Sequence, residues 1–430
     1  MKAFSLKNGM LIGTASAATQ IEGGEIDHSW LDWAKKGHIT DGSSPTKAND
    51  HYRLYREDAE LMRDMGMQIY RFGIEWARIE PEEGHFDEEA LAHYADELKL
   101  LRAYGIAPLV TLHHFTNPMW FERQGAFEKK ENLKYFLRFI EKTVASFGEL
   151  ANEYITINEP NVYATNGYFF GTWPPGVKSF SRTLNLLSML TLAHIEAYKA
   201  IHAQRRKMGF ADTKVSFANH VRVFAPENPK SFMHRMYAKL TERFFQGCIS
   251  QAMSNGSFTI PLRNTGGVKK SRYCDFIAVN YYTRSSVSGL DDGVRKNAPV
   301  NDLGWEIYPQ GIVECAKKLY EIVPLPIYIT ENGTCDNEDS FRSLYLYEHI
   351  RALCESELPV ERYYHWCFCD NFEWLEGESA RFGIVHIDYE TQKRTVKDSG
   401  RFLSAVIASG GVTEEIFDEF VANKSYKTNS

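Results

Sequence analysis

Eight short apolar runs recur along the 430-residue chain, and several of the segments between them have the 3.6-residue periodicity of amphipathic helices. Runs that are apolar throughout are typical of strands whose two faces are both covered in a parallel sheet. Eight strands alternating with helices predict an α/β fold, a single-domain (β/α)8 barrel of the TIM type, with its active site at the carboxyl ends of the strands. The expected strands are 10–16, 68–74, 107–112, 154–157, 214–219, 276–280, 326–330 and 363–368.

The expected helices are 50–65, 88–103, 133–147 and 183–208, and Gly66 and Gly105 end the first two. The polar segments 222–231 and 284–304 are interpreted as loops near the barrel mouth. We expect the catalytic barrel to occupy residues 1–420 and residues 421–430 to form a frayed C-terminal tail.

Charge and cysteine content exclude several classes of protein. Lys and Arg number 49 against 56 Asp and Glu, a net charge of −7 with no basic tract, so we expect no nucleic-acid partner and no membrane partner. The seven cysteines follow no zinc or disulfide pattern and are interpreted as reduced thiols. No apolar leader opens the sequence and no run is long enough to span a membrane, which predicts a cytoplasmic location. A homo-oligomer is left open.

Polar residues follow six of the eight expected strands, at the end where such a barrel carries its active site. This coincidence over six strands is more specific than any single residue. In chain order these residues are Gln20 and Glu22, His113 and His114, Asn158 and Glu159, Asn280 to Tyr282, Glu331 and Asn332, and Asp370 to Trp374.

Glu159 and Glu331, far apart in the sequence, should face each other across the barrel mouth. Glycoside hydrolysis needs two carboxyl groups of this kind, one to protonate the leaving group and one to attack the sugar or to activate water. Pro160 disfavours helical geometry at Glu159, which we therefore expect to be extended. Gly333 allows a sharp exit after Glu331. Arg71, near the end of the second strand, is expected beside Glu331, where it would favour the ionised carboxylate.

These motifs resemble those of glycoside hydrolase family 1, the β-glucosidase and β-galactosidase family. The resemblance extends from about Phe4 to about Ser404 and includes the tripeptide Asn158-Glu159-Pro160. The other segments that carry it are 4–23, 50–53, 70–79, 275–282, 329–333, 370–374 and 381–383.

The resemblance implies a retaining β-glycosidase that hydrolyses terminal non-reducing β-D-glucosyl residues by double displacement through a covalent glycosyl-enzyme. It implies no cofactor and no metal, and a small-molecule β-glucoside or short oligosaccharide as substrate. Glu159 would be the acid/base and Glu331 the nucleophile. Arg71 and Tyr282 would orient Glu331, and Asn158 would bond the 2-hydroxyl. The implied substrate-binding residues are Gln20, His114, Asn280, Trp305 on the aglycone side, Trp366 as a stacking floor, Glu373 and Trp374.

Two alternatives remain at this point. A 6-phospho-β-glucosidase of the same family is disfavoured because the charges of Glu373 and Glu378 would repel a phosphate. A non-catalytic sugar-binding barrel has no support, because both glutamates are present. Phe115 stands where the family usually has Trp, and Asn161 and Glu378 also depart from its usual pattern. The natural aglycone and the preference between glucosides and galactosides therefore stay open.

Overall fold

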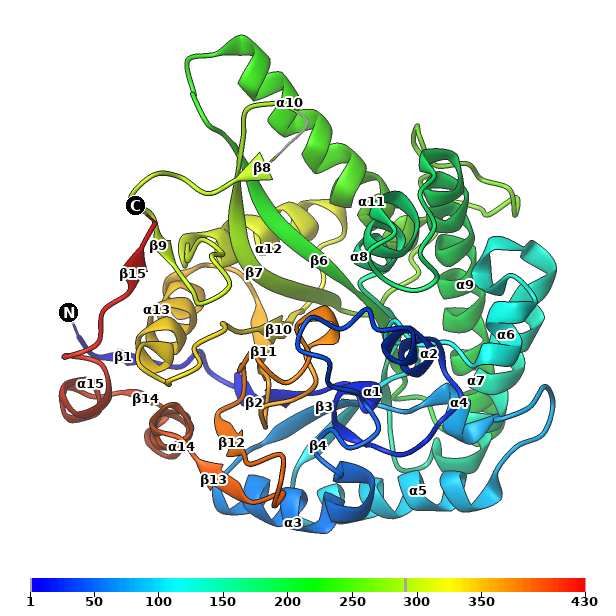
Figure 1. The fold of residues 1–430 in the computed structure, drawn as a ribbon, viewed down its shortest axis with the longest axis horizontal. Helices are drawn as coiled ribbons and strands as arrows, with labels where there is room; N and C mark the ends of the chain where they lie inside the picture. Colours follow the sequence, from blue (N-terminus) through cyan, green and yellow to red (C-terminus); the bar gives the residue numbers. More distant parts are fainter. Residues whose placement is uncertain (1, 290–291, 430) are drawn as a thin grey trace.

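A closed barrel of eight parallel strands forms the centre of the protein (Figure 1). The computed structural model describes residues 2–289 and 292–429. Each barrel strand pairs in parallel with the next one, and β10 pairs with both β7 and β11, which closes the barrel. The predicted (β/α)8 fold is therefore confirmed. The barrel strands are β2 (Leu11–Ala15), β3 (Ile69–Gly73), β4 (Ala107–Thr111), β5 (Glu153–Asn158), β6 (Lys214–Pro226), β7 (Ile277–Val287), β10 (Ile327–Asn332) and β11 (Val360–Trp366).

The barrel strands are buried because helices cover their outer faces and side chains fill the barrel interior. Every residue of β3, β5 and β10 is buried, which explains why these strands appear as continuous apolar runs rather than alternating ones. Asn158, Glu331 and Asn332 lie at the carboxyl ends of these strands, at the site described below. Glu153, by contrast, begins β5 and forms an ion pair with Arg362 near the start of β11.

Helices follow the strands and surround the barrel (Figure 1). Two have the predicted bounds, α5 (Glu88–Ala103) and α7 (Leu133–Phe147). The α5 helix begins there because the Asp87 carboxylate accepts from the backbone N–H groups of Glu89 and Ala90. The other principal helices are α3 (His51–Asp64), α9 (Phe180–Lys207), α11 (Cys248–Asn255), α12 (Gln310–Ile322), α13 (Arg342–Glu355) and α14 (Asp398–Ser409).

Shorter elements complete the outer layer and the loops at the barrel mouth. Two of them, η3 and η4, are π-helical, a form that often occurs at functional sites. The shorter elements are α1 (Ala18–Ile21), α2 (Ser29–Lys35), α4 (Trp76–Ile79), α6 (Met119–Arg123), η1 (Ala126–Glu128), η2 (Lys130–Asn132), α8 (Pro160–Ala164), η3 (Thr165–Phe170), η4 (Arg243–Gly247), η5 (Trp374–Glu376), β1 (Phe4–Ser5), β12 (Val385–Ile387), β13 (Arg394–Val396) and β14 (Gly411–Val412).

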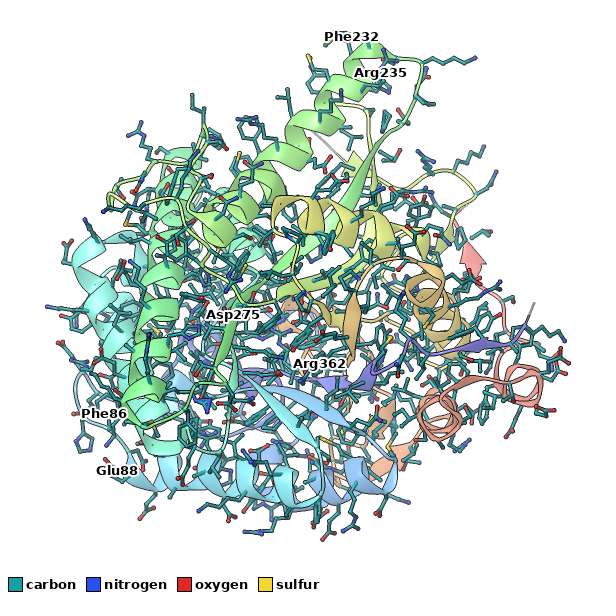
Figure 2. The ribbon with its side chains drawn as sticks, turned by 180° about the vertical axis from the view of Figure 1, so that it is seen from behind. Phe86, Glu88, Phe232, Arg235, Asp275 and Arg362 are labelled. Atoms are coloured by element: carbon teal, nitrogen blue, oxygen red, sulfur yellow. The ribbon has the colours of Figure 1, made fainter. Side chains whose placement is uncertain are left out.

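Strands β6 and β7 continue beyond the barrel mouth, where the sequence predicted loops. Their added residues pair in register, Val223 with Arg284 and Pro226 with Val287. Polar residues interrupt the apolar pattern here, so only the cross-strand partner reveals the strands. Helix α10 (Phe232–Glu242) and β8 (Asp292–Gly293) extend this arm, which projects away from the barrel (Figures 1 and 2).

The C-terminal segment packs against the protein, so the expected frayed tail is wrong. After α15 (Glu414–Phe420), β15 (Lys427–Thr428) pairs with β9 (Pro299–Val300). The Tyr426 hydroxyl donates to Glu348 at 2.7 Å. These contacts join residues distant in sequence, which composition alone does not reveal.

All seven cysteines are free thiols, as the sequence predicted. Within residues 2–289 and 292–429, no helix combines the length and the apolarity needed to cross a membrane.

Candidate active site

The twelve residues predicted for the site come together at the carboxyl end of the barrel. Eight of them line one cleft of about 600 Å³: His114, Glu159, Tyr282, Trp305, Glu331, Trp366, Glu373 and Trp374. The other four, Gln20, Arg71, Asn158 and Asn280, are fully buried and hydrogen-bond to residues of that lining.

Glu331 lies near the end of β10, between a cation and a phenol. Arg71 Nη1 donates to its Oε1 and the Tyr282 hydroxyl donates to its Oε2, each at 2.6 Å. Burial raises the pKa of Glu331 to about 7, above its usual value, although the Arg71 charge and both hydrogen bonds act to lower it. Arg71 thus favours the ionised carboxylate, the direction that the sequence predicted.

Glu159 lies at the junction of β5 and α8 and has different partners. Its Oε1 accepts from Asn280 Nδ2 at 2.8 Å and lies 3.3 Å from His220 Nδ1. The expected extended backbone is wrong, because Glu159 has φ +41°, in the left-handed region. This conformation is held from both sides. The Glu159 N–H donates to the Ala218 carbonyl at 2.7 Å, and the Glu159 carbonyl accepts from the Tyr163 N–H at 3.0 Å.

A chain of buried hydrogen bonds connects the two glutamates. Asn158 Oδ1 accepts from Arg71 Nη2 at 2.6 Å and from Asn280 Nδ2 at 3.0 Å. Asn280 in turn contacts Glu159, and Arg71 contacts Glu331. Because each member is fixed by its neighbours, both carboxyl groups are held in defined positions before any ligand binds.

At the far end of the cleft, Glu373 accepts from Gln20 Nε2 at 3.3 Å and from the Trp366 indole N–H at 3.4 Å. Burial raises the pKa of Glu373 to about 8. His114 is kept neutral because burial holds its pKa well below the usual value. Its Nε2 accepts from Asn158 Nδ2 at 2.9 Å, so the ring proton is on Nδ1.

Two buried polar atoms at this end have no partner among the described residues, Gln20 Oε1 and His114 Nδ1. A buried polar atom without a partner is costly, so a hydrogen bond from a ligand to either of these two atoms would be favourable. In the same part of the chain, residues 2–289 and 292–429, no cluster of three or more His, Cys, Asp or Glu side chains is arranged to hold a metal ion.

Aromatic rings surround these polar groups. Trp366 lies 5.8 Å from the His114 ring, and Trp305, which is 36% exposed, packs edge-on against Tyr282 at 6.0 Å. Gly333 permits the strand carrying Glu331 to approach Trp366, because a Cβ there would lie 1.9 Å from the Trp366 carbonyl oxygen.

Sequence reasoning missed His220, which contacts Glu159. Burial lowers the pKa of His220, and the charge of Glu159 acts in the opposite direction. Arg222 also contacts His220: Arg222 Nη2 and Nε lie 3.1 and 3.2 Å from His220 Nε2. The signal was available, since His220 directly follows the expected strand 214–219 and the rule that polar residues end the strands applies to it as well.

The arrangement has two buried carboxyl groups in one cleft with unlike surroundings, one beside a cation and the other among neutral donors. Such a pair can divide the roles of ionised nucleophile and proton donor.

Known proteins share both this sequence pattern and this fold. The sequence model for glycosyl hydrolase family 1 matches residues 3–412. Beta-glucosidase A from Thermotoga maritima is 31% identical over 94% of this chain and 98% of its own. Beta-glucosidase A from Acetivibrio thermocellus is 30% identical over 93% and 97%.

Solved structures agree with the sequence comparison. The beta-glycosidase from Pyrococcus horikoshii superposes with a TM-score of 0.87 and 32% identity, covering 97% of this chain and 98% of its own. The Thermotoga maritima beta-glucosidase in complex with glucoimidazole superposes with a TM-score of 0.87 and 29% identity, covering 96% and 100%. With the family model matching almost the whole chain, this protein belongs to glycosyl hydrolase family 1.

Proposed function

We propose that the protein is a β-glucosidase that retains anomeric configuration and releases terminal non-reducing β-D-glucosyl residues. The observation that carries this proposal is the pair of buried carboxyl groups, Glu159 and Glu331, which line one cleft with different partners. The names of the relatives support glucose as the sugar.

In the first step, the Glu331 carboxylate attacks the anomeric carbon. The bond from this carbon to the glycosidic oxygen breaks as its bond to a Glu331 oxygen forms. Glu159 gives its proton to the departing oxygen, so the aglycone leaves as an alcohol and the sugar remains as an ester of Glu331. Arg71 and Tyr282 hold Glu331 in position for this attack.

In the second step, water attacks the same carbon from the side that the aglycone left. Glu159 accepts a proton from this water, and the ester bond breaks to restore the Glu331 carboxylate. Two displacements at one carbon return the β configuration. Asn158, held between Arg71 and Asn280, would bond the 2-hydroxyl, where contacts tighten in the transition state.

The sugar ring would extend from the two glutamates toward Glu373, with Trp366 as a stacking floor and Trp374 also lining its site. Gln20 Oε1 and His114 Nδ1, which lack partners among the described residues, would bond its hydroxyls. Glu373 would accept from further hydroxyls. Such bonds discriminate strongly, because a sugar without the hydroxyl leaves the buried protein group unpaired.

The partners of Glu373 argue against a 6-phosphorylated sugar. Its carboxyl group is held by the Gln20 amide and the Trp366 indole, both neutral donors. A phosphate dianion would need cations at this place.

Labelling with 2,4-dinitrophenyl 2-deoxy-2-fluoro-β-glucoside tests the assignment. Mass spectrometry should find one fluoroglucosyl group on the peptide that contains Glu331, and Glu331→Ala should neither be labelled nor turn over plain glucosides. Binding without covalent labelling would support a non-catalytic barrel. NMR of the first product should show β-glucose; initial α-glucose would refute retention.

A second measurement tests the sugar. Kinetics of gluco-, galacto-, fuco- and 6-phosphoglucosides that share one leaving group should rank the plain glucoside above its 6-phosphate. The reverse order would assign the protein to the phosphoglucosidases.

We further propose that the barrel acts as a single catalytic unit in the cytoplasm. Seven free cysteine thiols are consistent with a reducing compartment.

A further inference from the structure

The cleft continues past the two glutamates into a second, apolar part. We call this part the apolar groove and define it by Phe169, Phe170, Phe180, Leu240, Phe244 and Phe245, which all line the same cleft as the glutamates. One wall comes from η3 and the start of α9, and the other from α10 and η4.

Five of these side chains are exposed, whereas most large apolar side chains of the protein are buried. Phe169, Phe170, Phe180, Leu240 and Phe244 are between 40% and 57% exposed. Phe169 lies 4.9 Å from Phe170 and 6.0 Å from Phe180, centroid to centroid, so these three rings form one continuous surface. Contiguous exposed apolar surface of this kind marks a binding site.

The groove begins at the residue proposed as the acid. Glu159 contacts His220, and the His220 ring packs edge-on against Phe245 at 5.8 Å. Phe245 in turn packs against Phe224 at 5.7 Å. Since the acid must face the glycosidic oxygen, the group attached to that oxygen emerges on this side of the cleft. The inference therefore rests on the proposed function.

Two of the polar side chains near the groove, Thr183 and Arg222, are engaged by other residues of the protein. The Thr183 hydroxyl donates to the Ser179 carbonyl at 2.9 Å. Arg222 is bonded to His220 and to Ser285, and its guanidinium lies 5.2 Å from the Phe245 ring. A second sugar unit would bring several hydroxyls against phenyl rings, where each unpaired hydroxyl is costly.

We propose that the preferred substrates are β-glucosides whose aglycone is an elongated apolar group, such as a long alkyl chain, and that the apolar groove binds this group. The cleft volume, about 600 Å³, is within the range of sites that enclose a ligand larger than one sugar. Hydrolysis then transfers glucose to water and releases an apolar alcohol.

The test is a series of n-alkyl β-glucosides from butyl to decyl, each below its critical micelle concentration, with cellobiose alongside. These alcohols are nearly equal as leaving groups, so differences report binding of the chain. We expect kcat/KM to rise about two- to fourfold for each added CH2 group until the groove is filled. Cellobiose should be cleaved more slowly than octyl glucoside.

The double variant Phe169→Ser/Phe244→Ser should flatten this dependence on chain length. The matched control is Phe232→Ser, on the same arm: Phe232 is 68% exposed at the far end of α10 (Figure 2), does not belong to the groove, and its loss should leave the dependence intact. If the double variant does not fold, the wild-type series alone decides the question.

Three outcomes would overturn the proposal. A flat alkyl series with fast cellobiose cleavage would assign the groove to a second sugar and leave the β-glucosidase assignment standing. A flat series together with a dimer that the double variant dissociates, measured by light scattering, would make the groove a contact between two copies. No turnover of any glucoside and no fluoroglucosyl labelling would instead refute the proposed function itself.

Discussion

The hydroxyl of Tyr282 should set the acid limb of the pH–activity profile. It donates to Glu331 Oε2 at 2.6 Å in a buried site, and burial raises the pKa of Tyr282 well above its usual value, so the hydroxyl keeps its proton during the assay. In Tyr282→Phe the carboxylate loses this donor. Because the bond stabilises the charged form and lowers the pKa of Glu331, its loss raises that pKa.

The size of the shift follows from the strength of the bond. A hydrogen bond to a charged group is worth about 1.5–3 kcal/mol. One pKa unit corresponds to about 1.4 kcal/mol, so the pKa of Glu331 should rise by about one to two units. The proposed attack on the sugar requires ionised Glu331, and the acid limb of kcat/KM for 4-nitrophenyl β-glucoside should therefore move to higher pH by the same amount.

Tyr281→Phe is the matched control. Tyr281 is the neighbouring residue on β7, and its hydroxyl donates to the Tyr308 carbonyl at 2.6 Å, away from both glutamates. That variant should leave the acid limb in place. The reasoning is refuted if Tyr282→Phe folds with an unchanged Tm and an unchanged acid limb, or if both variants shift the limb equally.

Three further changes test other parts of the structure. Glu159→Ala should slow cleavage of alkyl glucosides far more than that of 2,4-dinitrophenyl glucoside, because a good leaving group does not need the acid; steady-state kinetics measures the ratio. Gly333→Ala should lower Tm and the free energy of unfolding by about 1–3 kcal/mol or more, since the added Cβ overlaps a backbone carbonyl. His51 is buried between Asp58 and Glu97; burial acts to lower its pKa, but these carboxylates raise it to about 10. Its charge therefore stabilises the fold fully below its ordinary pKa of about 6.5, and this contribution disappears as pH rises to about 10, so the Tm difference between wild type and His51→Gln should be largest near pH 6 and smallest near pH 10.

A specific result would contradict each of these three predictions. Equal losses on both substrate types would argue against the acid role of Glu159. Gly293→Ala, where a Cβ meets nothing within 4 Å, should be neutral, and an equal loss there would remove the steric explanation for Gly333. A Tm difference for His51→Gln that does not change with pH would show that its charge is not the stabilising feature.

Local signals explain which elements were predictable. The α5 helix begins where Asp87 caps it, and Gly105 follows its end, so both limits are encoded within a few residues. The extension of β6 and β7 depends on their pairing with each other, and the docking of β15 depends on β9. Pairing between distant segments leaves little trace in either segment alone.

The site, like the fold, has features that nearby residues predict and features that depend on contacts between distant segments. Residues at strand ends, including both glutamates, were identified from position and resemblance. The backbone of Glu159 was not, because the preference that Pro160 imposes is for extended geometry, and the folded protein adopts the left-handed region instead. That choice is made by Ala218 and Tyr163, which contact Glu159 only in the folded chain.

The two partners of Glu159 both approach the same oxygen, Oε1. A carboxylic acid carries its hydrogen on a single oxygen, and an oxygen that accepts from an amide is the unprotonated one. In the proposed first step, the hydrogen that Glu159 gives to the departing oxygen is therefore the one on Oε2. Departure of the alcohol and activation of water would then use this one atom, so the direction of proton delivery is set by the protein before the substrate arrives.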